Sequence, residues 1–402
     1  MPSWYNIHTM AFSFFTKQKQ DESLILLVDI GSASVGVALA KIEEERHPRI
    51  LFTVREDIPF QETLSSARFL SGMLHALERS LKNLQVQGKD LGAPAHTFCT
   101  FSSPWFILKN RTIKISRTEP FQVTEKALNI LLDEDIERLK DELKETLPPA
   151  DIEVIEKKII EMKLNGYEIK NPYGQTTNQM EILATVSLSS KKVISGVERI
   201  ISQFFYAPSV HFGSFPVAAF SAVRDIFPEE RNFLFLDITG ETTDVSLITN
   251  DLFMGTTSFP RGRNFLVRDI STGEHTLHAE ANTLFGMFLR DELEAKKREH
   301  IGAIITQGRD EWVARLEKSL ATFANVGMLP RKIYFTADTE VAGFFMGLIN
   351  KARTELWAGE GMQVAYLDQQ MVSKFVTFDK EIVRDPFIAI EALLAAKIMI
   401  QK

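Results

Sequence analysis

The sequence predicts an α/β protein with two lobes of related design and a small α+β subdomain inserted into the first lobe. Three observations predict this fold class. Two apolar strands, at residues 24–28 and 233–236, each end in Asp-Ile and continue through a turn of small residues into a second strand. Strands and amphipathic helices alternate around both hairpins, as expected for sheets covered by helices. Residues 102–189 depart from this alternation, which indicates an inserted unit.

Composition excludes several classes of protein. The 402-residue chain has a formal net charge of −7, which argues against non-specific binding to nucleic acid. Cys99 is the only cysteine, so an intrachain disulfide and a cysteine-rich metal site are excluded and a cytoplasmic location is expected. No apolar run reaches the roughly 20 residues that a membrane-spanning helix needs. We expect residues 1–22 to form a flexible leader and residues 387–400 a buried helix.

The second hairpin, residues 232–248, has an acid at its mouth and a glycine in its turn. The strand ends in Asp237, and the turn contains Thr239, Gly240, Glu241 and Thr242. Amides and hydroxyls of such a turn can approach a phosphate closely, and Asp237 can hold a hydrated divalent cation. For this hairpin taken alone, an ordinary glycine turn between two core strands is the better explanation.

The first hairpin has the same pattern about two hundred residues earlier. Asp29 ends its strand, and the turn contains Gly31, Ser32, Ala33 and Ser34. Together the two hairpins predict a phosphate clamp in which the two turns face each other across a cleft. Asp29 and Asp237 would then share one Mg²⁺ through water.

The other elements are expected in the following order. Strands are expected at residues 23–60, 96–101, 112–116, 180–188 and 332–336, where β-branched and aromatic residues are frequent. Helices are expected at residues 63–84, 124–146, 193–205, 216–223, 276–299, 311–323 and 341–350, where apolar residues recur at helical spacing. Residues 152–164 mix β-branched and charged residues and fit either a strand or a helix.

A duplicated phosphate-gripping hairpin is the signature of the actin-like ATPase superfamily, and the chain resembles that superfamily, in particular its bacterial FtsA and PilM branch. The resemblance implies an actin-like (ribonuclease H-like) duplicated two-lobed ATPase fold. Residues 23–101 and 190–228 would form the first lobe (1A), and residues 102–189 an inserted SHS2-like interaction subdomain (1C). Residues 229–402 would form the second lobe (2A and 2B), with 2B at about 259–331.

The resemblance also implies further cofactor-binding residues. Gly262 matches the glycine-containing turn before the helix that lines the nucleotide cleft, and Glu280 matches an acid near the ribose. Ala337 and Asp338 stand where the family has a Gly-Gly pair against adenine and ribose. A side chain there would crowd a nucleoside and a carboxylate would repel its phosphates, which weakens the expectation of tight ATP binding.

The function that the resemblance implies is that of an adaptor or scaffold at the bacterial inner membrane, in type IV pilus assembly (PilM-like) or cell division (FtsA-like). ATP and Mg²⁺ would be conformational ligands with slow hydrolysis at most, because residues 216–219 offer no Gln or acid to orient water. The expected partner is a cytoplasmic peptide of an inner-membrane pilus or division protein, docked between the insert and the body. A second copy of the chain is another expected partner, and the membrane would be reached only through partners.

Two stretches divide the pilus and division hypotheses. Residues 171–174, Asn-Pro-Tyr-Gly, resemble a turn in the FtsA insert, whereas residues 14–17, Phe-Phe-Thr-Lys, and the compact length resemble PilM. Two other functions remain as alternatives: a degenerate pseudo-ATPase scaffold that no longer binds nucleotide, and a small-molecule kinase of the same superfamily. A kinase needs a carboxylate base that faces a hydroxylated substrate, and no obvious one follows either hairpin.

Overall fold

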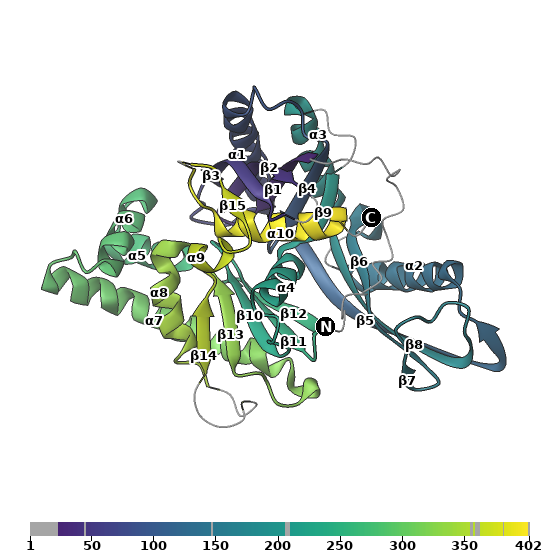
Figure 1. Ribbon diagram of the computed structural model, residues 1–402. Coiled ribbons are helices and arrows are strands. Elements are labelled where there is room, and N and C mark those ends of the chain that lie inside the picture. Colours follow the sequence, from purple (N-terminus) through teal and green to yellow (C-terminus); the bar gives the residue numbers. More distant parts are fainter. Residues whose placement is uncertain are drawn as a thin grey trace.

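The computed structural model describes residues 23–43, 46–145, 148–205, 210–353, 357, 362–380 and 382–400. In this part of the chain the strands form three sheets, and the smallest of them projects beside the two larger ones (Figure 1). The leader expected at residues 1–22 lies outside the described residues.

The two strands that end in aspartate occupy equivalent positions in two sheets of the same design. β1 (Ser23–Ile30) pairs antiparallel with β2 (Ser34–Ile42) and parallel with β4 (His96–Phe101). β10 (Phe233–Ile238) pairs in the same way with its own two neighbours, β11 (Thr243–Thr249) and β13 (Lys332–Thr336). The outer strands are β3 (Arg49–Asp57), β9 (Val210–Ser214), β12 (Leu252–Phe259), β14 (Gln363–Tyr366) and β15 (Thr377–Phe378). The order β3-β2-β1-β4-β9 of the first sheet repeats as β12-β11-β10-β13-β14 in the second, and β15 adds a sixth strand to the first sheet. The predicted duplication therefore extends to five strands of each sheet.

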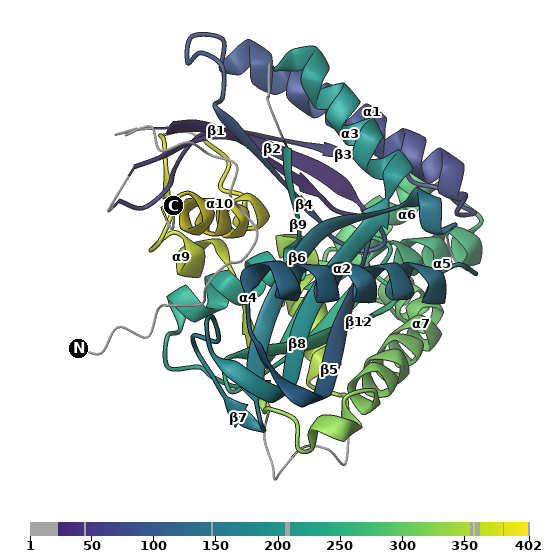
Figure 2. The same ribbon diagram turned by 90° about the vertical axis from the view of Figure 1, so that its right-hand side faces the viewer.

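Helices cover both faces of the first sheet. α1 (Ser66–Gln87) and α3 (Lys191–Phe204) lie on one face, and α4 (Phe215–Ile226) and α10 (Pro386–Ile400) on the other (Figure 2). α10 is apolar on nearly all sides, and such a helix is stable only when it is buried. Its position confirms the buried helix predicted at residues 387–400. After the second sheet, the chain passes through the short α9 (Gln369–Val372), and α10 then packs on the first sheet.

The second sheet is covered by helices that differ in part from the expected ones. They are α5 (Asn264–Glu274), α6 (His278–Leu289), α7 (Ala295–Ala321) and α8 (Thr339–Ile349), and a 3₁₀ turn, η2 (Ala324–Val326), follows α7. The helix predicted at residues 276–299 is interrupted after Leu289, where Asp291 adopts a left-handed backbone (φ 61°). The helix predicted at residues 311–323 begins earlier, because α7 passes through Gly308 without a break. Glycine at this position permits close packing on α5, since a Cβ there would lie 2.5 Å from Asp269 Oδ2.

The third sheet contains β5 (Phe106–Gln122), β6 (Ile152–Leu164), β7 (Tyr167–Glu168) and β8 (Thr176–Ser190) in the order β5-β8-β6-β7. Helix α2 (Glu125–Glu142) covers one face, and a 3₁₀ turn, η1 (Pro149–Asp151), precedes β6. Residues 152–164, which fitted either element, form a strand because β8 pairs along their length. At residues 171–174, Gly174 has a φ of 76° and donates its N–H to Val123 O, so this turn requires glycine. No helix in the described ranges is long and apolar enough to cross a membrane.

A carboxyl group lies in the core between α10 and the first sheet. Glu391 is completely buried, and both its Oε atoms lack a hydrogen-bond partner, although the backbone of Val28 and Thr100 faces them. Burial, with a smaller contribution from Asp29, raises the pKa of this carboxyl well above 4.5. Folding therefore takes up a proton, so the stabilisation that neutral Glu391 provides is complete below about pH 4.5 and is lost as pH rises through the folded-state pKa.

We predict that Glu391→Gln makes the pH dependence of stability shallower. In the wild-type protein this single group lowers the free energy of unfolding by up to about 1.4 kcal/mol per pH unit as pH rises. Glutamine has the shape of the protonated acid but does not titrate. Denaturant unfolding between about pH 5 and pH 8 measures the difference, with the exposed Glu134→Gln as control. Equal slopes for wild type and Glu391→Gln would contradict the prediction.

Candidate functional site

The two predicted metal-binding acids lie in equivalent rows of side chains across the sheets. Asp29 is opposite Thr100 on β4 and Gly36 on β2, and both neighbours share its face of the sheet. Asp237 is opposite Thr336 on β13 and Asp244 on β11. Both acids are almost completely buried. The duplicated topology therefore places a threonine beside each acid on one side. On the other side Asp29 has a glycine and Asp237 has a second aspartate.

Asp237 is held by hydroxyl groups from both lobes. Ser102, which follows β4 of the first lobe, donates to its Oδ2 at 2.8 Å, and Thr336 donates to its Oδ1 at 2.9 Å. Burial, followed by the nearby Asp244, raises the pKa of Asp237 well above 3.8. Asp29 lies opposite Thr100 on β4, two residues before Ser102, so the hydrogen bond from Ser102 brings the two acids to one junction.

Asp29 is paired with an arginine. Arg55 Nη2 donates to Asp29 Oδ2 at 2.7 Å, while Asp29 Oδ1 is buried without a partner. Burial raises the pKa of Asp29 to about 6 and Arg55 opposes that rise, so the carboxyl is ionised at neutral pH. Of the first-turn residues, Gly31 accepts a hydrogen bond from Trp105 Nε1 at its carbonyl, and Ser34 Oγ accepts one from Arg55.

The two predicted phosphate-binding turns touch each other. Ser32 Oγ lies 2.6 Å from Thr239 Oγ1 and accepts a hydrogen bond from the Glu241 amide at 2.8 Å. A Cβ on Gly240 would lie 2.6 Å from the Cβ of Ala33, so only glycine permits this approach. Thr242 Oγ1 donates to the Ser103 carbonyl and closes the same junction. Groups at hydrogen-bond distance leave no space for a phosphate between them.

Gly262 joins this junction from a third segment. A Cβ at residue 262 would lie 2.1 Å from Thr239 O and 2.6 Å from Gly240 O. The next two amides, of Arg263 and Asn264, donate to the same two carbonyls at 2.9 and 2.7 Å. The predicted glycine turn before a helix is therefore present at the start of α5, and it packs directly against the second hairpin.

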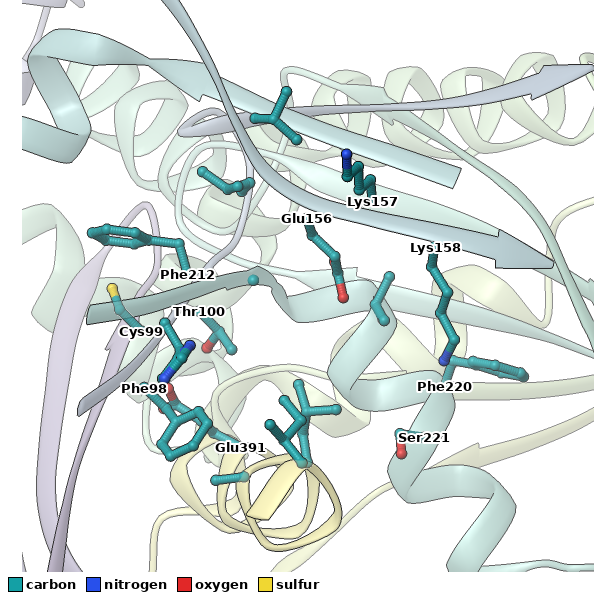
Figure 3. A pocket seen from close by; sticks show the side chains of 18 of the residues that line it. Phe98, Cys99, Thr100, Glu156, Lys157, Lys158, Phe212, Phe220, Ser221 and Glu391 are labelled. Atoms are coloured by element: carbon teal, nitrogen blue, oxygen red, sulfur yellow. The ribbon is translucent and has the colours of Figure 1, made fainter. Parts of the chain in front are cut away.

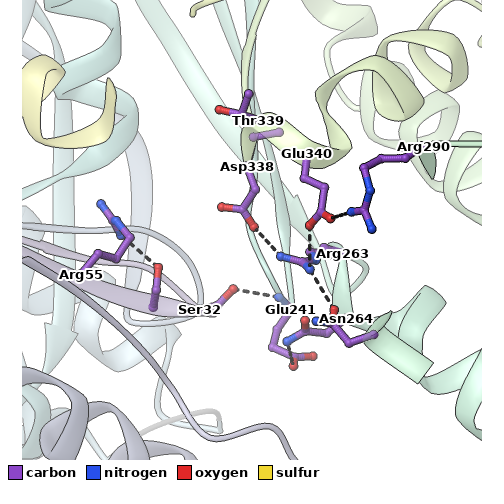
Figure 4. A network of polar contacts seen from close by, with 12 residues as sticks. Ser32, Arg55, Glu241, Arg263, Asn264, Arg290, Asp338, Thr339 and Glu340 are labelled. Atoms are coloured by element: carbon purple, nitrogen blue, oxygen red, sulfur yellow. Dashed lines mark hydrogen bonds and ion pairs between the residues drawn. The ribbon is translucent and has the colours of Figure 1, made fainter. Parts of the chain in front are cut away.

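Ion pairs fill the surroundings of the junction (Figure 4). The Glu241 carboxylate accepts hydrogen bonds from Arg268 at 2.7 and 2.8 Å and from Asn264 at 2.8 Å. Asp338, at the start of α8, pairs with Arg263 at 3.2 Å. These carboxylates, each paired with an arginine of the same lobe, surround the predicted phosphate-binding turn of the second hairpin.

The remaining predicted residues lie at the edge of the site or outside it. Ala337 is buried, and its carbonyl accepts a hydrogen bond from Tyr366. Glu280 is exposed on α6, and its carboxylate accepts a hydrogen bond from Thr276. Arg55 and Arg268 were not predicted as site residues, because only the pairing register of β3 and the packing of α5 show that these two reach the site.

This arrangement does not fit Mg²⁺-ATP. The two turns contact each other directly, Asp29 already has a cationic partner, and the Asp338 carboxylate stands beside the expected adenosine position. In addition, no cluster of three or more His, Cys, Asp or Glu residues suited to a metal ion occurs within the described ranges.

A second feature is a cavity of about 580 Å³ between the insert and the first lobe (Figure 3). Its walls come from β6 and α2 of the insert and from β4, β9, α4 and α10. Phe98, Phe212, Val217, Phe220 and Leu394 are among its apolar lining residues.

Two charged residues of β6 also line the cavity. Glu156 accepts hydrogen bonds from Ser187 and Ser214, and burial raises its pKa. Burial lowers the pKa of Lys158, which has no ion pair within hydrogen-bonding distance among the described residues.

Comparison with solved structures identifies the fold. A chain of the PilM-PilN type IV pilus biogenesis complex is similar with a TM-score of 0.62 and 14% identity, over 93% of this chain and 98% of that chain. Weaker similarity is found to a Bacteroides thetaiotaomicron protein with actin-like ATPase fold and unknown function (TM-score 0.41, 10% identity, 93% and 96% covered). No protein-family model and no curated protein matches the sequence. The similarity to the chain of the PilM-PilN complex, together with the repeated sheet topology, shows the duplicated two-lobed actin-like fold that the two hairpins predicted.

We predict that Gly262→Ala destabilises the protein by about 1–3 kcal/mol, because the added Cβ overlaps the Thr239 carbonyl oxygen and pushes the Gly262 turn away from the second hairpin. Gly343→Ala is the matched control: it lies on an exposed position of α8 with open space around it. This control should be neutral or stabilising by about 0.5–1 kcal/mol. Denaturant unfolding compares the two variants. Gly262→Ala with wild-type stability would show that the turns do not depend on this contact.

Proposed function

We propose that this chain is an actin-like scaffold that docks a short cytoplasmic segment of an inner-membrane protein in type IV pilus assembly, and that it does so without nucleotide. The observation that carries the proposal is the cavity between the insert and the first lobe. The similarity to a chain of the PilM-PilN complex, which spans both lobes and the insert, supports a pilus role over a division role. The protein would reach the membrane only through this partner.

The chemistry of the cavity favours an extended, mainly apolar segment with one acidic group. Aromatic and aliphatic side chains form much of the wall, which suits apolar side chains of a partner. Lys158 has no direct ion pair among the described residues, although Glu156 lies near enough to act on its charge, and an acidic group on the partner would compensate for its burial. Among the described residues, β6 pairs only with β8 over residues 154–158, so its other edge can accept a strand.

We predict that Gly213→Leu blocks partner binding. Gly213 lines the cavity, and a Cβ there meets no atom within 4 Å, so a larger side chain extends into open space. Tagged protein would be used to capture partners from solubilised membranes of the source cells, with mass spectrometry to identify them. Wild type should retain an inner-membrane pilus assembly protein, and Gly213→Leu should reduce its recovery at least about tenfold, a loss of about 1.4 kcal/mol.

Gly347→Leu is the control, because Gly347 is exposed on α8 and also has open space around it. This variant should capture the partner as wild type does. Equal capture by Gly213→Leu would contradict docking in the cavity. Recovery of division-ring proteins instead of pilus proteins would contradict the pilus role and support a role in cell division.

A second candidate function keeps ATP and Mg²⁺ as conformational ligands. The observation in its favour is the convergence of Asp29 and Asp237, with Asp29 Oδ1 left without a partner. Opening of the junction between the turns would be needed before a nucleotide could enter.

We predict that millimolar Mg²⁺-ATP leaves the melting temperature of the wild-type protein unchanged. The two turns are in contact, and the carboxylates of Asp29 and Glu241 are already paired with Arg55 and Arg268. Thermal unfolding with and without Mg²⁺-ATP measures this directly. A rise in melting temperature that disappears in the Asp29→Ala, Asp237→Ala double variant would favour the second candidate. Capture of the partner is measured separately, so the two parts of the proposal can fail independently.

A further inference from the structure

We propose that Arg55 is a tethered counter-ion that closes a latent divalent-cation site formed by Asp29, Asp385 and Ser34. The inference rests on the proposed nucleotide-free function. It adds a specific cause, namely that the chain carries its own cation at the position where a metal ion would bind beside Asp29.

The register of the first sheet puts Arg55 in reach of Asp29. Gly36 on β2 is opposite Asp29 on β1 and also opposite Arg55 on β3, so the three residues form one row on the same face. The arginine extends across the middle strand to the acid. A Cβ on Gly36 would lie 2.5 Å from Arg55 Nη2 and 2.8 Å from Cζ, so this path exists only because residue 36 is glycine.

Each nitrogen of the guanidinium donates one hydrogen bond at this position. Nη2 donates to Asp29 Oδ2 at 2.7 Å, Nε to Asp385 Oδ2 at 2.7 Å, and Nη1 to Ser34 Oγ at 2.9 Å. The Phe387 ring lies 5.3 Å from Cζ, within range of a cation–π contact. The side chains of Asp29 and Asp385 are only 3% and 8% exposed. Two buried carboxylates therefore share one permanent cation, which satisfies charges that would be costly to bury unpaired.

The equivalent row of the second lobe has no cation. There, Asp237 is opposite Asp244, and Asp244 is opposite Ser258 on β12. Asp237 is held by the hydroxyls of Ser102 and Thr336 instead. The two lobes share a topology, so the arginine is a specific feature of the first row and not a consequence of the fold.

Without the guanidinium, the same oxygens would suit a hard divalent cation. Asp29 Oδ1 has no partner, and Asp29 Oδ2, Asp385 Oδ2 and Ser34 Oγ would each lose one. Carboxylate and hydroxyl oxygens are ligands that Mg²⁺, Mn²⁺ and Ca²⁺ prefer. Asp385 is also fixed in place, because its Oδ1 caps α10 by accepting hydrogen bonds from the amides of Phe387 and Ile388.

The test removes the arginine and measures cation binding without nucleotide. Arg55→Met should gain a melting-temperature rise of about 2 °C or more with millimolar MnCl₂ or MgCl₂, whereas wild type should show none. Arg55→Lys, which keeps the charge, should stay insensitive, and an added Asp29→Asn change should abolish the gain in Arg55→Met. Arg49→Met on the same strand is the control, because Arg49 pairs with Asp379 at the surface.

Folded Arg55→Met without a response to either cation would overturn the inference. Should this variant not fold in metal-free buffer, refolding by MgCl₂ would support the inference, and no rescue would overturn it. Nucleotide is absent from these experiments, so binding of Mg²⁺-ATP by the wild type would refute the proposed nucleotide-free function without deciding what Arg55→Met does.

Discussion

The direct contact between the two hairpin turns is the constraint on which the rest of the site depends. Ser32 meets Thr239 and Glu241 across 207 and 209 residues of chain, and glycine at residue 240 makes this approach sterically allowed. Gly262 packs on the other side of the same turn. Three segments therefore meet through backbone and small side chains, and this contact joins the two lobes.

The contact between the turns buries carboxylates, and the surrounding residues offset the free-energy cost of that burial. Asp29 and Glu241 are removed from water when the turns meet, and an unpaired buried carboxylate costs several kcal/mol. Each is matched by an arginine, Arg55 in the first lobe and Arg268 in the second. Asp237 has no arginine partner: hydroxyl groups of Ser102 and Thr336 donate to its two oxygens, and burial raises its pKa. The Asp29–Arg55 and Glu241–Arg268 ion pairs therefore compensate for the burial that the contact between the turns causes.

Local sequence patterns were sufficient for the fold but only partly for the site. The two Asp-Ile hairpins and the glycine turn at residue 262 were predictable because strand alternation and small-residue turns are encoded within a few residues. The pairing of Arg55 with Asp385 was not, because the two residues are 330 positions apart and a register shift lies between Leu39 and Ala40 on β2. The helix break at Asp291 was also missed, since only its φ angle marks it.

Helix α10 connects the Asp29–Arg55 pair to the cavity between the insert and the first lobe. Its first turn is capped by Asp385, which Arg55 holds, and its later residues Leu394 and Ile398 line the cavity. A helix of 15 residues spans about 22 Å as a rigid rod, so displacement at one end is transmitted to the other. The cation that holds this end of the helix belongs to the chain itself, so the wall that α10 gives to the cavity is anchored without a diffusible ligand.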